Sequence, residues 1–323
     1  MTKQLFAGID IGATNIKFGL VDADGDIAFR DQTSTPKEDS AEKLFDKIVL
    51  CGERLLVEAD ELEGEVRWIG VGSPGAVDIF TGMILGPCPN IPYWVGFHLR
   101  NRLEERLNLP IFVDNDANCA AMAEHRFGAG KGYKNIICMT IGTGIGGGLI
   151  LNGRLFRGAD YSAGEIGHMV IAEGYEEPEK TRILESIVSA PAIVARVKEK
   201  LANQVSPALQ SLTKSDLDNL TIRKVFAAIR KGDRLVPAII REKARILGVA
   251  LASLVNVLDP EIIVLGGGVV EGGAAFVDIV RDTIMASALP IATKSLKVTP
   301  AKLGNAAGFI GAALLGLDEP ASD

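Results

Sequence analysis

The chain has 323 residues, a formal net charge of −7 and 47% hydrophobic residues, which is typical of a globular protein with two domains. The acidic balance argues against a nucleic-acid partner, because nucleic-acid binding needs a basic face. Asp10 interrupts the apolar N-terminal stretch, and the longest apolar run, residues 246–258, is too short to cross a bilayer. The four cysteines lack the spacing of a metal site or a disulfide framework, which favours reduced, buried thiols. We therefore expect a cytoplasmic protein with no membrane partner.

The first third of the chain alternates between strand and helix patterns. Apolar runs predict strands at 5–12, at two segments of 15–33 around a turn at 23–26, at 67–75 and at 111–114. Apolar residues at three- and four-residue spacing predict helices at 40–60, with Ser40 as a candidate N-cap, and near 97–107. Residues 74–96 are rich in Pro and Gly, which predicts a loop.

A similar order of elements restarts near residue 135. Two strands joined by a glycine turn are predicted within 135–153, and further strands at 261–268 and 296–301. Helices are predicted at 184–202, 239–258, 274–289 and 305–317. This repetition, together with the similarity of "DIGAT" (10–14) to "TIGTG" (140–144), indicates an internal duplication of an α/β unit.

Two glycine-containing strand turns are candidate phosphate sites. In "IDIGATNIK", backbone N–H groups near Gly12 can point into one concavity and bind anionic oxygens, with Thr14 adding a hydroxyl and Lys17 a cation. Asp10 ends the first strand, where a Mg²⁺ that accompanies phosphates would sit. In "TIGTGIGGG" (140–148), the glycines weaken a strand pair, which is tolerable where a ligand approaches the backbone. This stretch lacks the lysine of a P-loop and the strand-turn-helix context of a dinucleotide site.

Three polar residues, Asp114, Asn115 and Asp116, end a buried strand in "FVDNDANCA". Such groups are costly to bury unless something binds them, so they indicate a ligand site. A helix predicted to begin near Ala117 would favour an anionic carboxylate at its N-terminus. A fixed carboxylate of this kind suits the acceptance of a hydroxyl proton during phosphoryl transfer. The pattern alone leaves both Asp114 and Asp116 as candidates for that base.

These motifs, in this order, resemble the ROK family of sugar kinases and sugar-responsive repressors. The resemblance spans nearly the whole chain and rests on "DIGATNIK", "GSPGAVD", "PNIPYW", "VDNDANCAAMAE", "TIGTGIGGG", "GEIGH", "LES", "LGGGV" and the small-residue C-terminal helix. It implies an α/β protein with the actin-like ATPase (ribonuclease H-like) fold, in which two α/β domains flank a cleft. The C-terminal helix then returns to the first domain, so we expect a small domain of residues 1–118 plus 305–323 and a large domain of residues 119–304.

The resemblance also implies roles for individual residues. Asp116 matches the general base of the family, and Asp10 a Mg²⁺ contact, direct or through water. Sugar contacts are implied for Gly75, Asn90, Asn115, Glu165, His168 and Glu185. ATP contacts are implied for Gly12, Thr14, Asn15, Lys17, Gly142, Thr143, Gly144 and Gly267. Carboxylates and amides suit sugars because each hydroxyl both donates and accepts a hydrogen bond.

Two family features are missing from the sequence. Many members bind zinc through the histidine of "GH" and three cysteines, whereas residues 169–183 contain no cysteine, so we expect no zinc site. Repressor members carry a helix-turn-helix before the first strand, for which no room is expected here. We therefore expect an ATP- and Mg²⁺-dependent hexose kinase acting on glucose at the 6-hydroxyl. The alternatives are an N-acetylmannosamine, N-acetylglucosamine or fructose kinase, or a non-catalytic sugar sensor. We also expect a homodimer.

Overall fold

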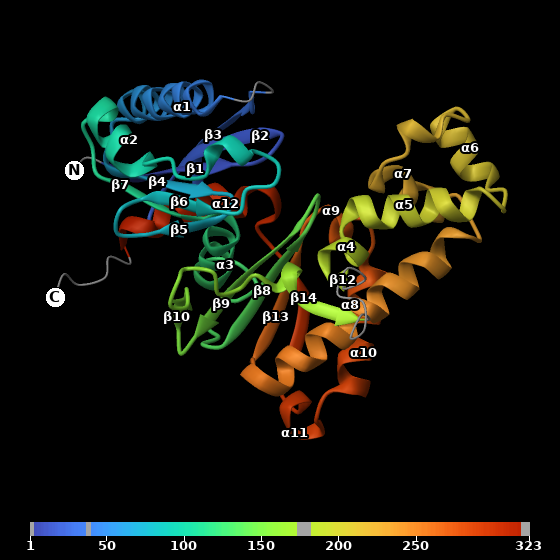
Figure 1. Ribbon diagram of the computed structural model, residues 1–323. Helices are drawn as coiled ribbons and strands as arrows, with labels where there is room; N and C mark the ends of the chain where they lie inside the picture. The colour runs from blue at the N-terminus through green and yellow to red at the C-terminus, as the bar shows by residue number, and fades with distance from the viewer. Residues whose placement is uncertain (1–2, 37–39, 173–181, 318–323) are drawn as a thin grey trace. The chain divides into compact units, whose positions relative to one another are not determined.

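The computed structural model describes residues 3–36, 40–172 and 182–317 (Figure 1). The described chain divides into two compact units. Unit 1 contains residues 1–132, 148–164 and 302–323, and unit 2 contains residues 133–147 and 165–301. The domain boundaries expected from the sequence differ from these units, because a boundary at residue 118 falls inside a helix of unit 1 that spans Asp116–Arg126.

The sheet of unit 1 has the strand order β3-β2-β1-β4-β7. The strands β1 (Lys3–Ile11), β2 (Asn15–Val21) and β3 (Ile27–Ser34) form an antiparallel meander. β4 (Gly64–Ser73) and β7 (Ile111–Asn115) continue the sheet in parallel with β1. The predicted strands of the first third are confirmed, and the carboxyl ends of β1, β4 and β7 lie at the same edge of the sheet.

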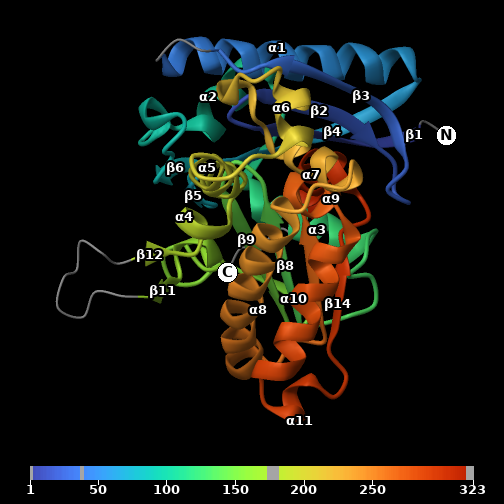
Figure 2. The same cartoon turned by 90° about the vertical axis from the view of Figure 1, so that its right-hand side faces the viewer.

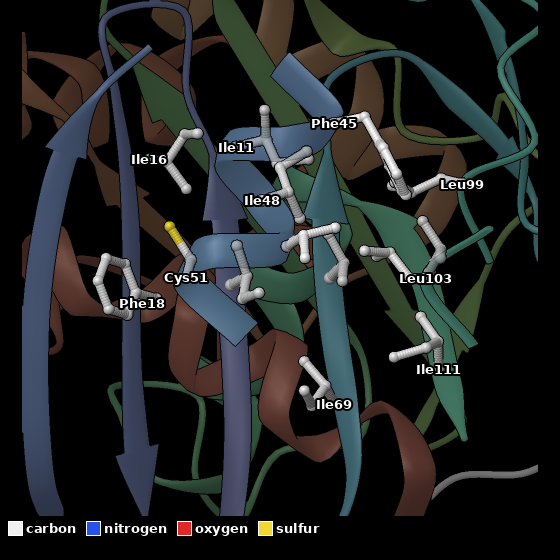
Figure 3. Packing of buried hydrophobic residues seen from close by; sticks show 14 of the residues in the cluster. Ile11, Ile16, Phe18, Phe45, Ile48, Cys51, Ile69, Leu99, Leu103 and Ile111 are labelled. Carbon is white, nitrogen blue, oxygen red and sulfur yellow. The ribbon is translucent and has the colours of Figure 1, made fainter. Parts of the chain in front are cut away.

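Two helices supply the apolar core on one face of this sheet. α1 (Ala41–Glu61) begins after Ser40, whose hydroxyl accepts the Lys43 N–H as the predicted cap. α2 (Leu99–Leu107) follows the loop that contains β5 (Ala76–Asp78), β6 (Met83–Gly86) and the 3-10 turn Pro92–Trp94. Figure 3 shows side chains from these helices and from the strands interdigitating: Ile11, Ile16, Phe18, Phe45, Ile48, Cys51, Ile69, Leu99, Leu103 and Ile111.

Two other helices of unit 1, α3 (Asp116–Arg126) and α12 (Ala307–Leu314), pack against each other. α12 also packs on β1 and β4, where glycines allow close approach. A Cβ on Gly8 would lie 1.9 Å from the carbonyl oxygen of Phe309, and one on Gly70 1.7 Å from that of Ala312. The helix backbone therefore lies directly on the strands, close to their carboxyl ends.

The second sheet repeats the strand arrangement of the first, with the order β10-β9-β8-β13-β14. Its strands are β8 (Ile136–Ile141), β9 (Ile145–Leu151), β10 (Arg154–Phe156), β13 (Ile262–Gly266) and β14 (Lys297–Pro300). β8, β13 and β14 are parallel, as β1, β4 and β7 are. The shared order agrees with the predicted duplication. α8 (Val236–Leu258) and α10 (Ala274–Ser287) pack side by side in unit 2 (Figure 2).

The remaining elements of unit 2 are short. They are the 3-10 turns Ile166–His168 and Leu217–Asn219, β11 (Val170–Ala172), β12 (Arg182–Ile183), α4 (Glu185–Val188), α5 (Ala190–Leu201), α6 (Pro207–Thr213), α7 (Ile222–Arg230), α9 (Gly268–Glu271) and α11 (Pro290–Thr293). The prediction of one helix over 184–202 is wrong, because Ser189 is extended and separates α4 from α5. α6 and α7 were not predicted from the sequence.

Candidate functional site

The junction of β7 and α3 gives three consecutive polar residues three different environments. Asn115 is the N-cap of α3, and its Oδ1 accepts the N–H groups of Ala117 at 2.9 Å and Asn118 at 3.2 Å. Its Nδ2 donates to the carbonyl of Gly75 at 3.1 Å, which joins two predicted sugar contacts. Asp116 opens the helix and is half-buried, with its Oδ1 2.8 Å from the Ala117 nitrogen.

Asp114 is a buried ion-pair partner. Its side chain is 3% exposed, and Oδ2 accepts a hydrogen bond from Arg157 Nε at 2.7 Å. Oδ1 accepts the Asn115 N–H at 2.7 Å and the Asn118 Nδ2–H at 2.9 Å. Three donors, one of which also carries the countercharge, are rarely concentrated on a carboxylate that must accept a proton, so this geometry favours a structural role. Arg157 was not predicted from the sequence, because it lies 43 positions from Asp114 and belongs to none of the motifs.

Asp10 and Lys17 face each other across the β1–β2 pair, with 3.9 Å between Lys17 Nζ and Asp10 Oδ2. Burial raises the pKa of Asp10 to about 6, although the charge of Lys17 lowers it. Gly308 of α12 leaves room for this carboxylate, because a Cβ there would lie 2.5 Å from its carboxyl carbon. A divalent cation in this position would favour the ionised carboxylate, so the residues present fit a Mg²⁺ that accompanies phosphates.

The turn between β1 and β2 is closed by its own backbone and by Thr35, the residue after β3. The Gly12 N–H donates to the carbonyl of Asn15 at 3.0 Å. Thr35 holds the turn from outside, since its hydroxyl donates to the Gly12 carbonyl at 2.6 Å and its N–H donates to that of Thr14 at 3.0 Å. Thr14 itself is exposed, so its hydroxyl is available to a ligand. Thr35 was not recognised from the sequence.

Three acidic residues of unit 1 lie close to the buried Cys119. Its pKa is raised well above the ordinary thiol value, first by burial and then by the nearby charges of Asp114, Asp10 and Asp116. Asp10 pairs with Gly72 of β4, and a Cβ on Gly72 would lie 3.4 Å from the Cα of Asp116, so the structure brings Asp10 and Asp116 together in this unit although they are 106 positions apart in the chain. The thiol remains protonated and is a small apolar filler.

The loop before α2 exposes Asn90 to solvent and buries Trp94. Asn90 is exposed, between β6 and the 3-10 turn. Trp94 is fully buried, its indole Nε1 donates to Ser73 Oγ at 3.1 Å, and its ring stacks on Phe97 at 4.5 Å. Trp94 therefore packs this loop against the core of unit 1.

Three predicted sugar contacts lie close together in unit 2. Glu165 directly precedes a 3-10 turn, His168 is the last residue of that turn, and Glu185 opens α4. Loss of solvent around its carboxyl group raises the pKa of Glu165, the charge of His168 opposes this, and the Glu185 carboxylate adds to it. Glu165 and His168 remain exposed, so their polar atoms can reach a ligand.

Glu185 also holds the glycine turn between β8 and β9. Its Oε2 accepts the Ile145 N–H at 2.7 Å, and a Cβ on Gly144 would lie 2.7 Å from the same oxygen. The Ala190 N–H donates to the carbonyl of Gly142 at 2.9 Å, and the Gly142 N–H donates to that of Gly144 at 2.9 Å. Thr143 at the tip is exposed. The predicted sugar and phosphate contacts of unit 2 are thus joined through one carboxylate.

Gly267 lies beside the same turn. Its φ of 89° favours glycine, and a Cβ there would lie 2.5 Å from the carbonyl oxygen of Ile141, the last residue of β8. The predicted nucleoside contact and the predicted phosphate turn are therefore neighbours within unit 2.

Within 3–36, 40–172 and 182–317, no group of three or more His, Cys, Asp or Glu side chains is placed to hold a metal ion. The predicted lack of a zinc site concerns residues 169–183, most of which lie outside the described residues. In the same ranges, no helix is long and apolar enough to cross a membrane.

Comparisons with known proteins show similarity to sugar kinases over nearly the whole chain. The glucokinase of Halalkalibacterium halodurans is 36% identical over 96% of this chain and 94% of its own length. The glucokinase of Thermotoga maritima is 32% identical over 97% of each chain. The crystal structure of a ROK family glucokinase from Streptomyces griseus, in complex with glucose and AMPPNP, superposes with a TM-score of 0.83 at 33% identity and covers 96% of this chain and 98% of that one.

The two sheets of matching strand order, each with a hairpin turn at the end of its central strand, define an α/β protein of the actin-like ATPase fold. The model of the ROK family matches residues 6–319. The chain belongs to the ROK family, and the resemblance seen in its motifs is confirmed.

Proposed function

We propose that this protein is an ATP-dependent glucokinase, which transfers the γ-phosphoryl group of ATP to the 6-hydroxyl of glucose. The observation that carries the assignment of the base is the contrast between Asp114 and Asp116. Asp114 is buried and committed to Arg157, whereas Asp116 is half-buried at the start of α3. The relatives named glucokinase at 32–36% identity over almost the whole chain support glucose as the acceptor.

In the proposed reaction, the 6-hydroxyl oxygen forms a bond to the γ-phosphorus as the bond to the β-γ bridging oxygen breaks. The hydroxyl proton moves to the carboxylate of Asp116, and ADP carries away the electron pair of the broken bond. Asp116 is fixed at a helix N-terminus, which favours its anionic form before the proton arrives. Ionised Asp116 therefore accepts the proton late in phosphoryl transfer, when bond formation to phosphorus has made the hydroxyl acidic.

The other site residues are proposed to bind the sugar and ATP, and to hold the ion that neutralises phosphate charge. Glu165, His168 and Glu185 are proposed to bind sugar hydroxyls, together with Asn90, Asn115 and the backbone of Gly75. The turns at Gly12–Asn15 and Gly142–Gly144, with Lys17 and Gly267, are proposed to bind ATP. Mg²⁺, held near Asp10, would neutralise phosphate charge when it is bound. ATP and glucose occur together in the cytoplasm, which is the location we propose.

The two carboxylates can be separated by substitution. Asp116→Asn keeps the shape of the side chain and should retain glucose binding, while kcat falls by roughly 10²–10⁴. Glucose affinity is measured by calorimetry and turnover by ADP release, across a panel of sugars that includes fructose and the N-acetylated hexosamines. Wild-type kcat/KM should be highest for glucose. A tenfold preference for an N-acetylated hexosamine would reassign the substrate, and unimpaired turnover by Asp116→Asn would reject the base.

A homodimer is the second proposal, and it rests on an exposed apolar patch. α8, α10 and α11 pack together in unit 2 and leave large apolar side chains open to solvent: Val249, Val257, Met285, Leu289 and Ile291. Val257 and Ile291 are 78% and 77% exposed. Large apolar side chains exposed on helices that pack together are typical of protein interfaces, and we propose that a second copy of the chain covers them.

Light scattering after gel filtration tests this dimer. The wild-type protein should have twice the mass of the chain, and the double substitution Val257→Glu with Ile291→Glu should give monomers. Val205→Glu is the matched control, because Val205 is 73% exposed but lies before α6, outside the patch. A monomeric wild-type protein at micromolar concentration would reject the dimer.

A further inference from the structure

Glu124, near the end of α3, has a buried carboxylate bonded to two separate segments of backbone. The residue is 1% exposed. Its Oε2 accepts the Ala129 N–H at 2.8 Å, and its Oε1 accepts the N–H groups of Lys302 at 2.9 Å and Leu303 at 2.7 Å. Among the described residues, no basic side chain forms an ion pair with it. Three backbone donors therefore satisfy a charge that would otherwise be costly to bury.

The two tethered segments hold the helices that carry the proposed chemistry of unit 1. Ala129 belongs to the turn after α3, the helix that Asp116 opens. Lys302 and Leu303 precede α12, the helix whose Gly308 borders the Asp10 carboxylate. Glu124 thus links the end of α3 to the start of α12 through hydrogen bonds. These two helices position the proposed base and the proposed Mg²⁺ contact.

The space around the carboxylate is closed, so its position is narrowly defined. The N–H of Gly128 donates to the backbone carbonyl of Glu124, and a Cβ on Gly128 would lie 2.0 Å from Glu124 Oε2. A glutamine in place of Glu124 would keep the size of the side chain, but its NH₂ group would face at least one backbone N–H. That donor would lose its acceptor, and the tie would loosen without a cavity being formed.

We propose that Glu124 is a positioning residue for phosphoryl transfer, which fixes Asp116 relative to Asp10 by tying α3 to the start of α12. This inference rests on the proposed kinase function. Glu124 lies eight residues along α3 from Asp116, about 12 Å at the rise of a helix, so it acts through the helix pair and not by touching substrate. Small misplacements of reacting groups are enough to slow a reaction that depends on alignment.

Two substitutions loosen the tie in different ways, and a third is the control. Glu124→Gln removes one acceptor, and Gly128→Ala displaces the carboxylate by steric overlap while leaving its charge. Glu104→Gln is the matched control, because Glu104 Oε1 likewise accepts a backbone N–H outside its own helix, that of Ile111 at 3.2 Å. Glu104 lies on α2, and within the part of the chain that the structure describes its side chain bonds to Arg100 and Ile111, neither of which belongs to α3 or α12.

Steady-state kinetics and amide hydrogen exchange are measured well below the Tm of each variant. Glu124→Gln and Gly128→Ala should lower kcat about tenfold, leave KM for glucose within about twofold, and speed exchange at Lys302 and Leu303 about tenfold. Glu104→Gln should change none of these. If exchange accelerates while kcat stays at the control value, Glu124 is only structural and the proposal fails; unchanged exchange also overturns it. A wild-type protein that phosphorylates no sugar would instead reject the proposed function, so the two failures are distinguishable.

Discussion

Removing Arg157 should destabilise the protein more than neutralising its partner Asp114. Arg157→Gln leaves a carboxylate whose side chain is 3% exposed without its countercharge. Breaking a buried ion pair from one side costs about 3–5 kcal/mol. The Arg157 side chain is 23% exposed, so water can partly solvate Asp114 once the guanidinium is gone. We therefore expect a loss of unfolding free energy at the lower end of this range, about 3 kcal/mol. Asp114→Asn keeps the shape and leaves a guanidinium that can reach water, so about 1–2 kcal/mol is expected.

The double substitution should recover part of this loss. With both charges gone, no uncompensated ion is buried, so the pair of substitutions should cost less than the sum of the two single ones. Urea unfolding of the four proteins at pH 7.5 gives each free energy of unfolding, and an unchanged m-value shows that the states compared are the same. Turnover is measured on the same samples, where Asp114→Asn should retain kcat within about tenfold of wild type, since Asp116 is the proposed base.

Two results would refute this reasoning. Additivity of the two substitutions within about 0.5 kcal/mol would mean that the 2.7 Å contact between Arg157 Nε and Asp114 Oδ2 contributes no coupling. A loss of kcat in Asp114→Asn as large as that in Asp116→Asn, at intact folding, would mean that the wrong carboxylate was chosen. Arg157→Lys separates charge from geometry, because lysine restores the charge but cannot present the directed Nε–H.

Two further predictions concern ions. The folded-state pKa of Asp10 is raised from 3.8 to about 6, so the folded protein binds this proton more tightly than the unfolded chain does. The resulting stabilisation of the folded state is fully present below pH 3.8 and is lost as the pH rises through 6. Asp10→Asn should therefore raise the Tm of the ligand-free protein at pH 8. In the wild type, Mg²⁺ affinity during turnover should increase between pH 5 and 7, and excess chelator should abolish turnover; full activity in chelator would contradict this. Metal analysis should find no stoichiometric zinc, whereas zinc that survives dialysis and is lost in His168→Ala would show the prediction to be wrong.

The sequence was sufficient for elements with local signals. Ser40 at the head of α1 and the apolar runs of β1, β4 and β7 follow from capping and periodicity, which act over a few residues. The break between α4 and α5 also had a local signal that was overlooked. Pro191 lies in the first turn of α5, and a proline inside a helix would lose a hydrogen bond and clash with the turn before it. The helix therefore has to restart there.

The contacts that join distant segments could not be predicted. Arg157 lies 43 positions from Asp114 in the sequence, and Glu185 lies 40 positions from Ile145, whose N–H donates to its carboxylate. Neither pair has a periodicity or a spacing that one sequence reveals, because each depends on how strand ends and loops are brought together by the sheet. The roles of the individual site residues, including those of Glu165 and His168, stay predictions that the substitutions above address.

The change from strand to helix explains how three adjacent residues acquire three functions. Successive side chains of a strand point to opposite faces, while those at the start of a helix turn by about 100° per residue. Asp114 is the last fully buried position of β7 and points to Arg157, Asn115 turns back to cap the helix, and Asp116 enters the first turn. A shift of the helix start by one residue would exchange these environments and put the ion-paired carboxylate where the base is proposed. Ala at position 115 should therefore harm kcat as well as stability, since it removes the cap that fixes where α3 begins. Stability loss with unchanged kcat in Asn115→Ala would show that the register of the helix is set elsewhere.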